Sequence, residues 1–205
     1  MLYLLKENTM KKILFVIPLL ALSLNAQASE KSHSHTSKYA GQEKRVIKSL
    51  SPDDIAELRR GGGWGLAKAA ELNGVPGPAH LLEMKGKISL TEKQVSAISE
   101  LYTQMKSKAI KQGEKLITLE QELERLFKSR SITDATLRSS LNNISEARKE
   151  LRYIHLATHL KTPKILSAAQ IKKYNMLRGY SNPNPCANMP EGHDPEMWRK
   201  HNGCK

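Results

Sequence analysis

One short stretch, the sequence LTEKQV at residues 90–95, decides how most of this chain folds. Thr91 is a favoured N-cap residue, and Gln94 stands three positions later, where its side chain can reach back to the cap. Leu90 before the cap and Val95 in the first turn have the spacing of a hydrophobic staple. This capping box with its staple predicts that a long α-helix begins directly after Thr91.

Apolar residues continue from this start at steps of three and four, the period of one face of an α-helix. The stripe consists of Val95, Ile98, Leu101, Met105, Ala109, Leu116, Leu119, Leu123, Leu126 and Phe127. Gly113 interrupts it. Residues 92–128 are therefore predicted to form either one long kinked helix or two helices that bend near Gly113, and we favour the bend.

A second long helix is predicted after a short turn at residues 131–134, with Thr133 as its N-cap. Its apolar residues recur at helical spacing and are Leu137, Leu141, Ile144, Leu151 and Ile154. Because the turn is short, this helix should return antiparallel to the first. Pro163 ends it, since proline cannot continue a helix.

The sequence LSAAQI at residues 166–171 repeats the device that opens the first helix. Leu166 stands at the staple position, Ser167 at the cap, and Gln170 at the third helical position. Two equivalent capping boxes therefore bracket the helical core.

An extension precedes this core. A helix should begin after Ser51, because Pro52 suits the first turn and the two aspartates that follow face the positive end of the helix dipole. The glycines at 61–63 end it, and a second short helix is expected at residues 64–72. The Gly-rich stretch is interpreted as a hinge, since no Gly-Lys-Ser/Thr follows it, and Trp64 as an aromatic anchor that packs the extension onto the core.

The N-terminal residues 1–28 have the layout of a cleavable secretory signal peptide. Met10 and two lysines precede an apolar run, and the sequence Ala26-Gln27-Ala28 follows as a cleavage site. The run of about 12 apolar residues is shorter than the roughly 20 that span a membrane. We expect the exported protein to begin at Ser29 with a flexible polar tail. This tail and the short-helix extension together occupy residues 29–83.

Composition favours an all-α protein with a thin core. Aromatic residues make up 5% of the chain, whereas the strands of sandwiches and barrels need aromatic and β-branched residues. The formal net charge is +13, and removing residues 1–28, with three lysines and one glutamate, leaves +11. Such a surface attracts acidic proteins or anionic membranes, while export disfavours nucleic acid as a partner. No catalytic motif is present, so no enzyme activity is expected.

The two capping boxes resemble the paired Leu-Thr-x-x-Gln motifs of the Spy/CpxP family of periplasmic stress proteins. The matching residues are Leu90, Thr91 and Gln94 in the first copy and Leu166, Ser167 and Gln170 in the second. The second copy has serine in place of threonine, and the resemblance covers roughly residues 84–180. It implies an antiparallel hairpin fold of about four helices, in which the motifs are helix starts, and a cradle-like homodimer in the periplasm.

The resemblance also implies a function, that of an ATP-independent chaperone whose basic concave face binds unfolded envelope proteins. We assign this basic face to Lys106, Lys108 and Lys111. The CpxP resemblance adds the periplasmic domain of a sensor histidine kinase as another partner to consider.

The same fold serves in metal-stress proteins similar to ZraP and CnrX, which makes metal binding the alternative function. His155 and His159 are four residues apart, so a helix would point both imidazoles the same way, as a Zn, Ni, Co or Cu site requires. The simpler alternative is that His155 forms a hydrogen bond at the core edge and His159 is exposed. No metal is required by the chaperone function.

Residues 181–205 form a Pro-rich tail with both cysteines of the chain, Cys186 and Cys204. In an oxidising compartment an even pair of cysteines predicts a disulfide. The alternative is a four-ligand metal site that adds His193 and His201 to the two cysteines. The spacing matches no standard zinc finger, and we favour the disulfide.

Overall fold

A computed structural model describes residues 36–181, 184–187, 189 and 191–204. The predicted signal peptide, with its cleavage site, lies outside these residues. The described part of the chain is helical and contains no strand, so the all-α prediction is confirmed. None of the helices described is long and apolar enough to cross a membrane.

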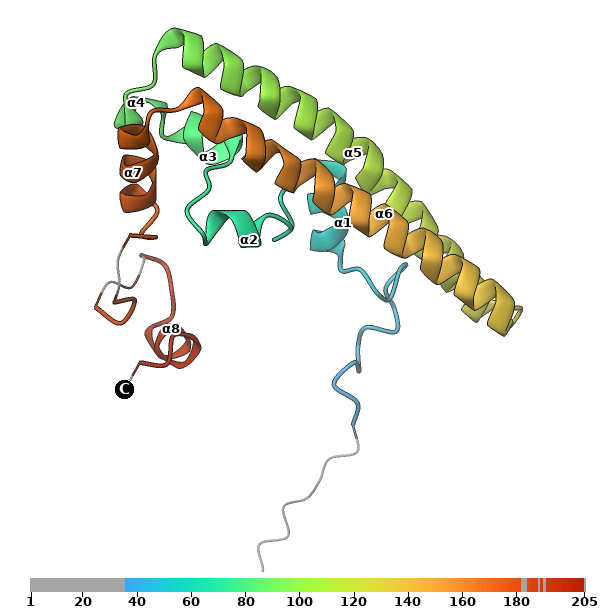
Figure 1. The fold of residues 1–205 in the computed structure, drawn as a ribbon. Coiled ribbons are helices and arrows are strands. Elements are labelled where there is room, and N and C mark those ends of the chain that lie inside the picture. Colours follow the sequence, from blue (N-terminus) through green and yellow to red (C-terminus); the bar gives the residue numbers. More distant parts are fainter. Residues whose placement is uncertain (1–35, 182–183, 188, 190, 205) are drawn as a thin grey trace, which may run out of the picture. The chain divides into compact units, whose positions relative to one another are not determined.

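The centre of the fold is a hairpin of two long helices, α5 (Glu92–Lys128) and α6 (Asp134–Lys161) (Figure 1). Each begins at the predicted cap: the Thr91 hydroxyl accepts a hydrogen bond from the Gln94 backbone N–H, and Thr133 caps α6 in the same way. The short turn between them brings α6 back antiparallel along α5, as the sequence predicted.

The division of the first helix at Gly113 is wrong. α5 runs through Gly113 without interruption, and this residue is buried where the end of α1 (Pro52–Arg59) packs against α5. A Cβ atom at position 113 would lie 2.6 Å from the backbone oxygen of Leu58. Glycine is therefore needed here for close packing of two backbones, not for a bend.

Three further short helices, α2 (Lys68–Glu71), α3 (Pro78–Glu83) and α4 (Lys85–Ile88), lead from α1 to α5. The helix expected over residues 64–72 is reduced to α2, because Trp64 and Gly65 have φ angles of 43° and 68°, which no α-helix contains. α1 begins after Ser51 as expected, and Ser51 and Asp54 form a capping box there.

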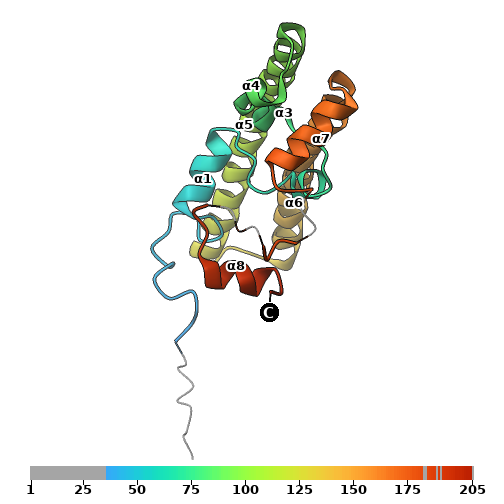
Figure 2. The same cartoon turned by 90° about the vertical axis from the view of Figure 1, so that its left-hand side faces the viewer.

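The extension contributes to the main core rather than lying apart from it. Ile47, Leu50 and Leu58 are fully buried against apolar residues of the hairpin. These hairpin residues are Met105, Ala109, Leu116, Ile117, Ile144, Ala147 and Leu151. Figure 2 shows α1 lying along α5, which is the helix it contacts.

A second core cluster joins the other end of the hairpin to α7 (Ala168–Leu177), which follows the 3₁₀ turn η1 (Thr162–Ile165). Tyr174 of α7 is fully buried with Leu81, Ile88 and Ile98. α7 therefore lies against α4 (Figure 1).

The two capping boxes are joined to each other in this region. The side-chain amides of Gln94 and Gln170, 76 residues apart in sequence, form two reciprocal hydrogen bonds of 2.9 Å. Each amide oxygen also accepts from its own cap backbone, that of Thr91 or Ser167. The Gln94 amide donates in addition to the carbonyl of Ile165. The paired motifs thus begin two helices and also connect them.

Candidate functional site

A groove runs between α5 and α6 and is lined by both apolar and charged side chains. Leu101, Ile154 and Ala157 line it, together with Lys108 from α5 and with Glu150 and Lys161 from α6. Its volume is about 180 Å³. Such a groove can hold an apolar side chain of a partner and place a negative group near the two ammonium groups.

The structure separates the three lysines that the sequence assigned to one basic face. Lys108 and Lys111 are exposed, and Lys108 lines the groove. Lys106 is half-buried, with its Nζ atom 5.8 Å from the ring centroid of Tyr102. At 100° per residue, Lys106 and Lys108 point in nearly opposite directions. Only Lys108 and Lys111 can therefore act together.

Large apolar side chains are exposed along the hairpin. The exposed fractions are 53% for Phe127, 46% for Leu141, 62% for Tyr153 and 70% for Leu160. Phe127 and Leu141 belong to the stripes predicted to face a core, but they lie near the turn of the hairpin, where the two long helices pack only on each other. Helical spacing identifies the apolar face, and it contains no information on how many neighbours cover that face.

The predicted histidine pair lies together and is buried. His155 and His159 of α6 are each 5% exposed, so His159 is not at the surface. Nδ1 of His159 is 2.8 Å from the carbonyl oxygen of Val75. Its ring packs on Gly77, where a Cβ atom would lie 2.6 Å from Cε1 of the ring. The close approach of the segment before α3 thus covers the imidazole of His159.

His155 is the unusual member of the pair. Its Nε2 atom is buried and has no hydrogen-bond partner. Burial, and secondarily the neighbouring His159, lower the pKa of His155. The neutral form is therefore favoured, and neutral imidazole is the form that binds metal ions.

The histidine pair lines a pocket of about 180 Å³ that also contains His80 and Glu71. His80 is engaged with acidic residues: its Nδ1 atom is 2.8 Å from Glu83, and its Nε2 atom is 3.8 Å from Glu71. Across the part of the chain that the structure describes, no three His, Cys, Asp or Glu side chains are grouped closely enough to hold a metal ion. Sequence reasoning missed His80 because it lies 75 residues from His155 and follows no motif.

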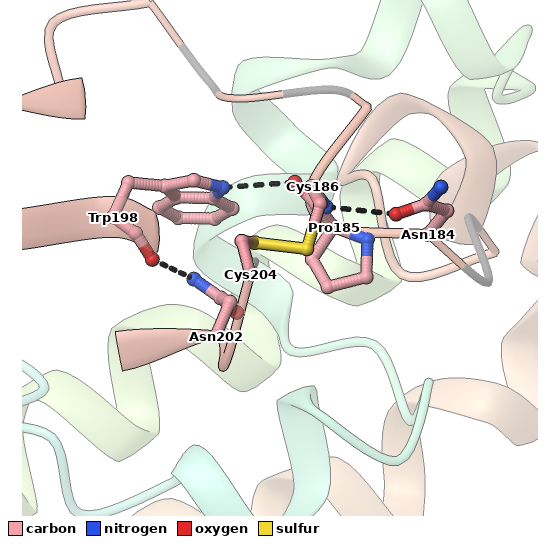
Figure 3. Close-up of a disulfide and its surroundings, with 6 residues drawn as sticks. All are labelled: Asn184, Pro185, Cys186, Trp198, Asn202 and Cys204. Carbon is pink, nitrogen blue, oxygen red and sulfur yellow. Dashed lines mark hydrogen bonds between the residues drawn. A yellow bond between two sulfur atoms is a disulfide. The ribbon is translucent and has the colours of Figure 1, made fainter. Parts of the chain in front are cut away.

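The cysteines form a disulfide between Cys186 and Cys204, the alternative that the sequence favoured (Figure 3). A hydrogen bond beside the disulfide also joins the two ends of this segment: Nε1 of Trp198, in α8 (Pro195–His201), donates to the carbonyl oxygen of Pro185. The two histidines of the alternative metal site are engaged elsewhere. The His193 ring lies edge-on to Trp198 at 5.0 Å, and Nδ1 of His201 contacts the carbonyl of Met197.

No protein-family model, curated protein or solved structure matches this chain. The similarity to the Spy/CpxP family therefore rests on the two motifs themselves. In the structure both motifs are helix starts, with Leu90 and Leu166 packed on the second core cluster.

Proposed function

We propose that this protein is a periplasmic stress protein that binds unfolded client proteins without ATP. One observation carries the proposal: the long hairpin exposes large apolar side chains on a surface with a strong excess of positive charge. The paired motifs and the signal-like N-terminus support the same assignment. A homodimer would double this surface and belongs to the proposal.

The physical basis is a combination of two weak attractions. Covering exposed apolar surface contributes roughly 25 cal/mol per Å², so several contacts with Phe127, Leu141, Tyr153 and Leu160 hold a client loosely. Long-range electrostatic attraction between the positively charged protein and acidic clients raises their association rate. Native proteins bury their apolar segments and so escape capture.

The test is suppression of aggregation of an acidic client, such as reduced α-lactalbumin, measured by light scattering. The triple variant Phe127→Ser, Leu141→Ser and Leu160→Ser should suppress aggregation several-fold less than the unmodified protein. Leu72→Ser, on the extension, removes a similarly exposed leucine and should have no effect. Equal suppression by all three proteins, with unchanged melting temperatures, would refute the proposal.

Metal binding is a second candidate function, supported by the buried and unpartnered Nε2 atom of His155. Nδ1 of His159 contacts the Val75 carbonyl oxygen. When Nδ1 carries the proton and donates it in this contact, the Nε2 lone pair of the same ring is available to a metal ion. A Zn, Ni, Co or Cu ion held by both rings would need at least one more ligand, and His80 and Glu71 line the same pocket. A bound ion would stabilise the folded state.

Titration calorimetry of the apo protein with Zn²⁺, Ni²⁺, Co²⁺ and Cu²⁺ tests this second function. The double variant His155→Ala and His159→Ala should lose binding and any metal-dependent rise in melting temperature. His193→Ala, in the tail, is the matched control and should bind normally. Micromolar binding that survives the double variant would place the metal elsewhere and refute the assignment.

A further inference from the structure

A second groove lies along a neighbouring face of α6, between this helix and the loop that follows α1. Trp64 and Leu66 form one wall, and the α6 residues that line it are Ser145, Arg148, Lys149, Arg152, Tyr153 and Leu156. Its volume is about 630 Å³. Three cations line it, and no acidic side chain from the described residues does.

The tryptophan wall is held in a backbone conformation that a bulky residue rarely adopts. Trp64 has φ of 43°, in the left-handed region. Its indole Nε1 donates to Asp54 at 2.8 Å, which fixes the ring against α1. Trp64 also packs against the main core, as predicted from the sequence. Strained backbone of this kind concentrates at functional sites.

Arg148 is preorganised beside this ring. Its guanidinium carbon lies 5.3 Å from the Trp64 ring centroid, within the range of a cation–π contact. It also forms a 2.8 Å ion pair with Glu120, whose carboxylate is buried and accepts a further hydrogen bond from Ser49. Arg148 therefore stays in place without a ligand.

Arg152 is the cation with no counter-charge. Lys149, one turn earlier, pairs with Glu146 at 2.6 Å, whereas no acid among the described residues pairs with Arg152. Tyr153, 62% exposed, stands next to it. An uncompensated guanidinium in a groove that Trp64 and Tyr153 also line is suited to a carboxylate that carries an apolar neighbour.

We propose that this groove binds an extended polypeptide segment in which acidic and apolar residues alternate. The proposal rests on the proposed client binding and names the class of segment that is bound. Ser145 and Leu156 are eleven residues apart on one helix, about 16 Å, which matches about five residues of extended chain. Successive side chains of such a segment point to opposite sides, so carboxylates would meet the cations of α6 while apolar residues cover Trp64 and Leu66 on the opposite wall.

The linear arrangement favours a peptide over a membrane surface. A helix that lies on a membrane presents a broad apolar face flanked by cations. Here the three cations all lie on α6, and the apolar residues Trp64 and Leu66 form the wall opposite them. An anionic vesicle would reach the rim of the groove and leave Trp64 uncovered.

The experiment measures fluorescence anisotropy of a labelled decapeptide of alternating glutamate and leucine. Arg152→Glu should weaken binding at least tenfold. The same variant should gain affinity for the charge-reversed peptide of alternating lysine and leucine. Arg138→Glu is the control, an exposed arginine on the same helix, and should change affinity less than twofold. In a Trp198→Phe background, emission from Trp64 should shift on peptide binding.

Two results would overturn the proposal. One is equal peptide binding by Arg152→Glu and the unmodified protein. The other is equal or tighter binding of phosphatidylglycerol vesicles, or of an oligothymidylate, with the same dependence on Arg152.

If peptide binding is lost in Arg152→Glu but the unmodified protein suppresses no aggregation, the groove is supported and the chaperone function is refuted. If peptide binding and suppression both survive in Arg152→Glu, the groove is refuted and the function stands.

Discussion

Replacing Gly113 by alanine separates two explanations of the glycine in the middle of α5. If glycine only weakened the helix, Gly113→Ala would stabilise the protein by about 1 kcal/mol, the difference in helix propensity. In the structure the added Cβ would lie 2.6 Å from the Leu58 oxygen and 3.1 Å from its carbonyl carbon, against 3.4–4 Å for ordinary contact. α1 would have to retreat by about 0.8 Å.

The cost of this retreat exceeds the gain in propensity. Overpacking a close contact costs typically 1–3 kcal/mol. The upper half of that range applies because the clash involves backbone, which cannot rotate away as a side chain can, and because the Leu58 side chain is fully buried in the core. The net expectation is a destabilisation of about 1–2 kcal/mol, or roughly 2–8 °C in melting temperature for a chain of this length.

The assay is urea and thermal unfolding followed by circular dichroism, with hydrogen exchange of the α1 amides. Gly86→Ala is the matched control, since Gly86 lies in α4 with nothing within 4 Å of an added Cβ. It should be neutral or stabilising by up to about 1 kcal/mol. The Gly113 variant should also speed exchange in α1 selectively. Stabilisation of both variants by similar amounts would refute the packing explanation.

Three further outcomes are expected. Gln94→Ala and Gln170→Ala should each lower the free energy of unfolding by about 1–2 kcal/mol. Because the two amides form hydrogen bonds with each other, the double variant should lose clearly less than the sum of the two single losses. Additive losses would show that the pair is not coupled. Because burial lowers the pKa of His155 in the folded state, stability should be full above the unfolded pKa of about 6.5 and fall as pH drops below it. In melts with EDTA from pH 7.5 to 5.5, His155→Gln should flatten this dependence, and an unchanged slope would contradict it. Reducing the Cys186–Cys204 disulfide should raise the rate of hydrogen exchange in α8 and leave α5 protected. The reason is that closing such a loop stabilises the folded state by about 3 kcal/mol. Unchanged exchange in α8 would contradict a stabilising role of the disulfide.

Local features of the sequence were enough to predict the starts of α1, α5, α6 and α7 and the all-α class. A capping box such as Thr91 with Gln94, or Ser167 with Gln170, is complete within four residues, so its geometry does not depend on the rest of the fold. Helical periodicity likewise identified most of the buried apolar residues of α5 and α6. The disulfide was predictable because the tail offers each cysteine a single partner.

Tertiary packing decided what these elements do to one another. Gly113 accommodates the backbone of Leu58, 55 residues earlier, and His159 is buried because the segment at Gly77 packs on its ring. The groove beside Trp64 exists only where the loop after α1 meets α6. Such contacts join residues far apart in the chain, and their geometry depends on how whole helices pack. A local pattern of residue types does not determine how whole helices pack. For this reason the sequence predicted the helices but not the surfaces between them.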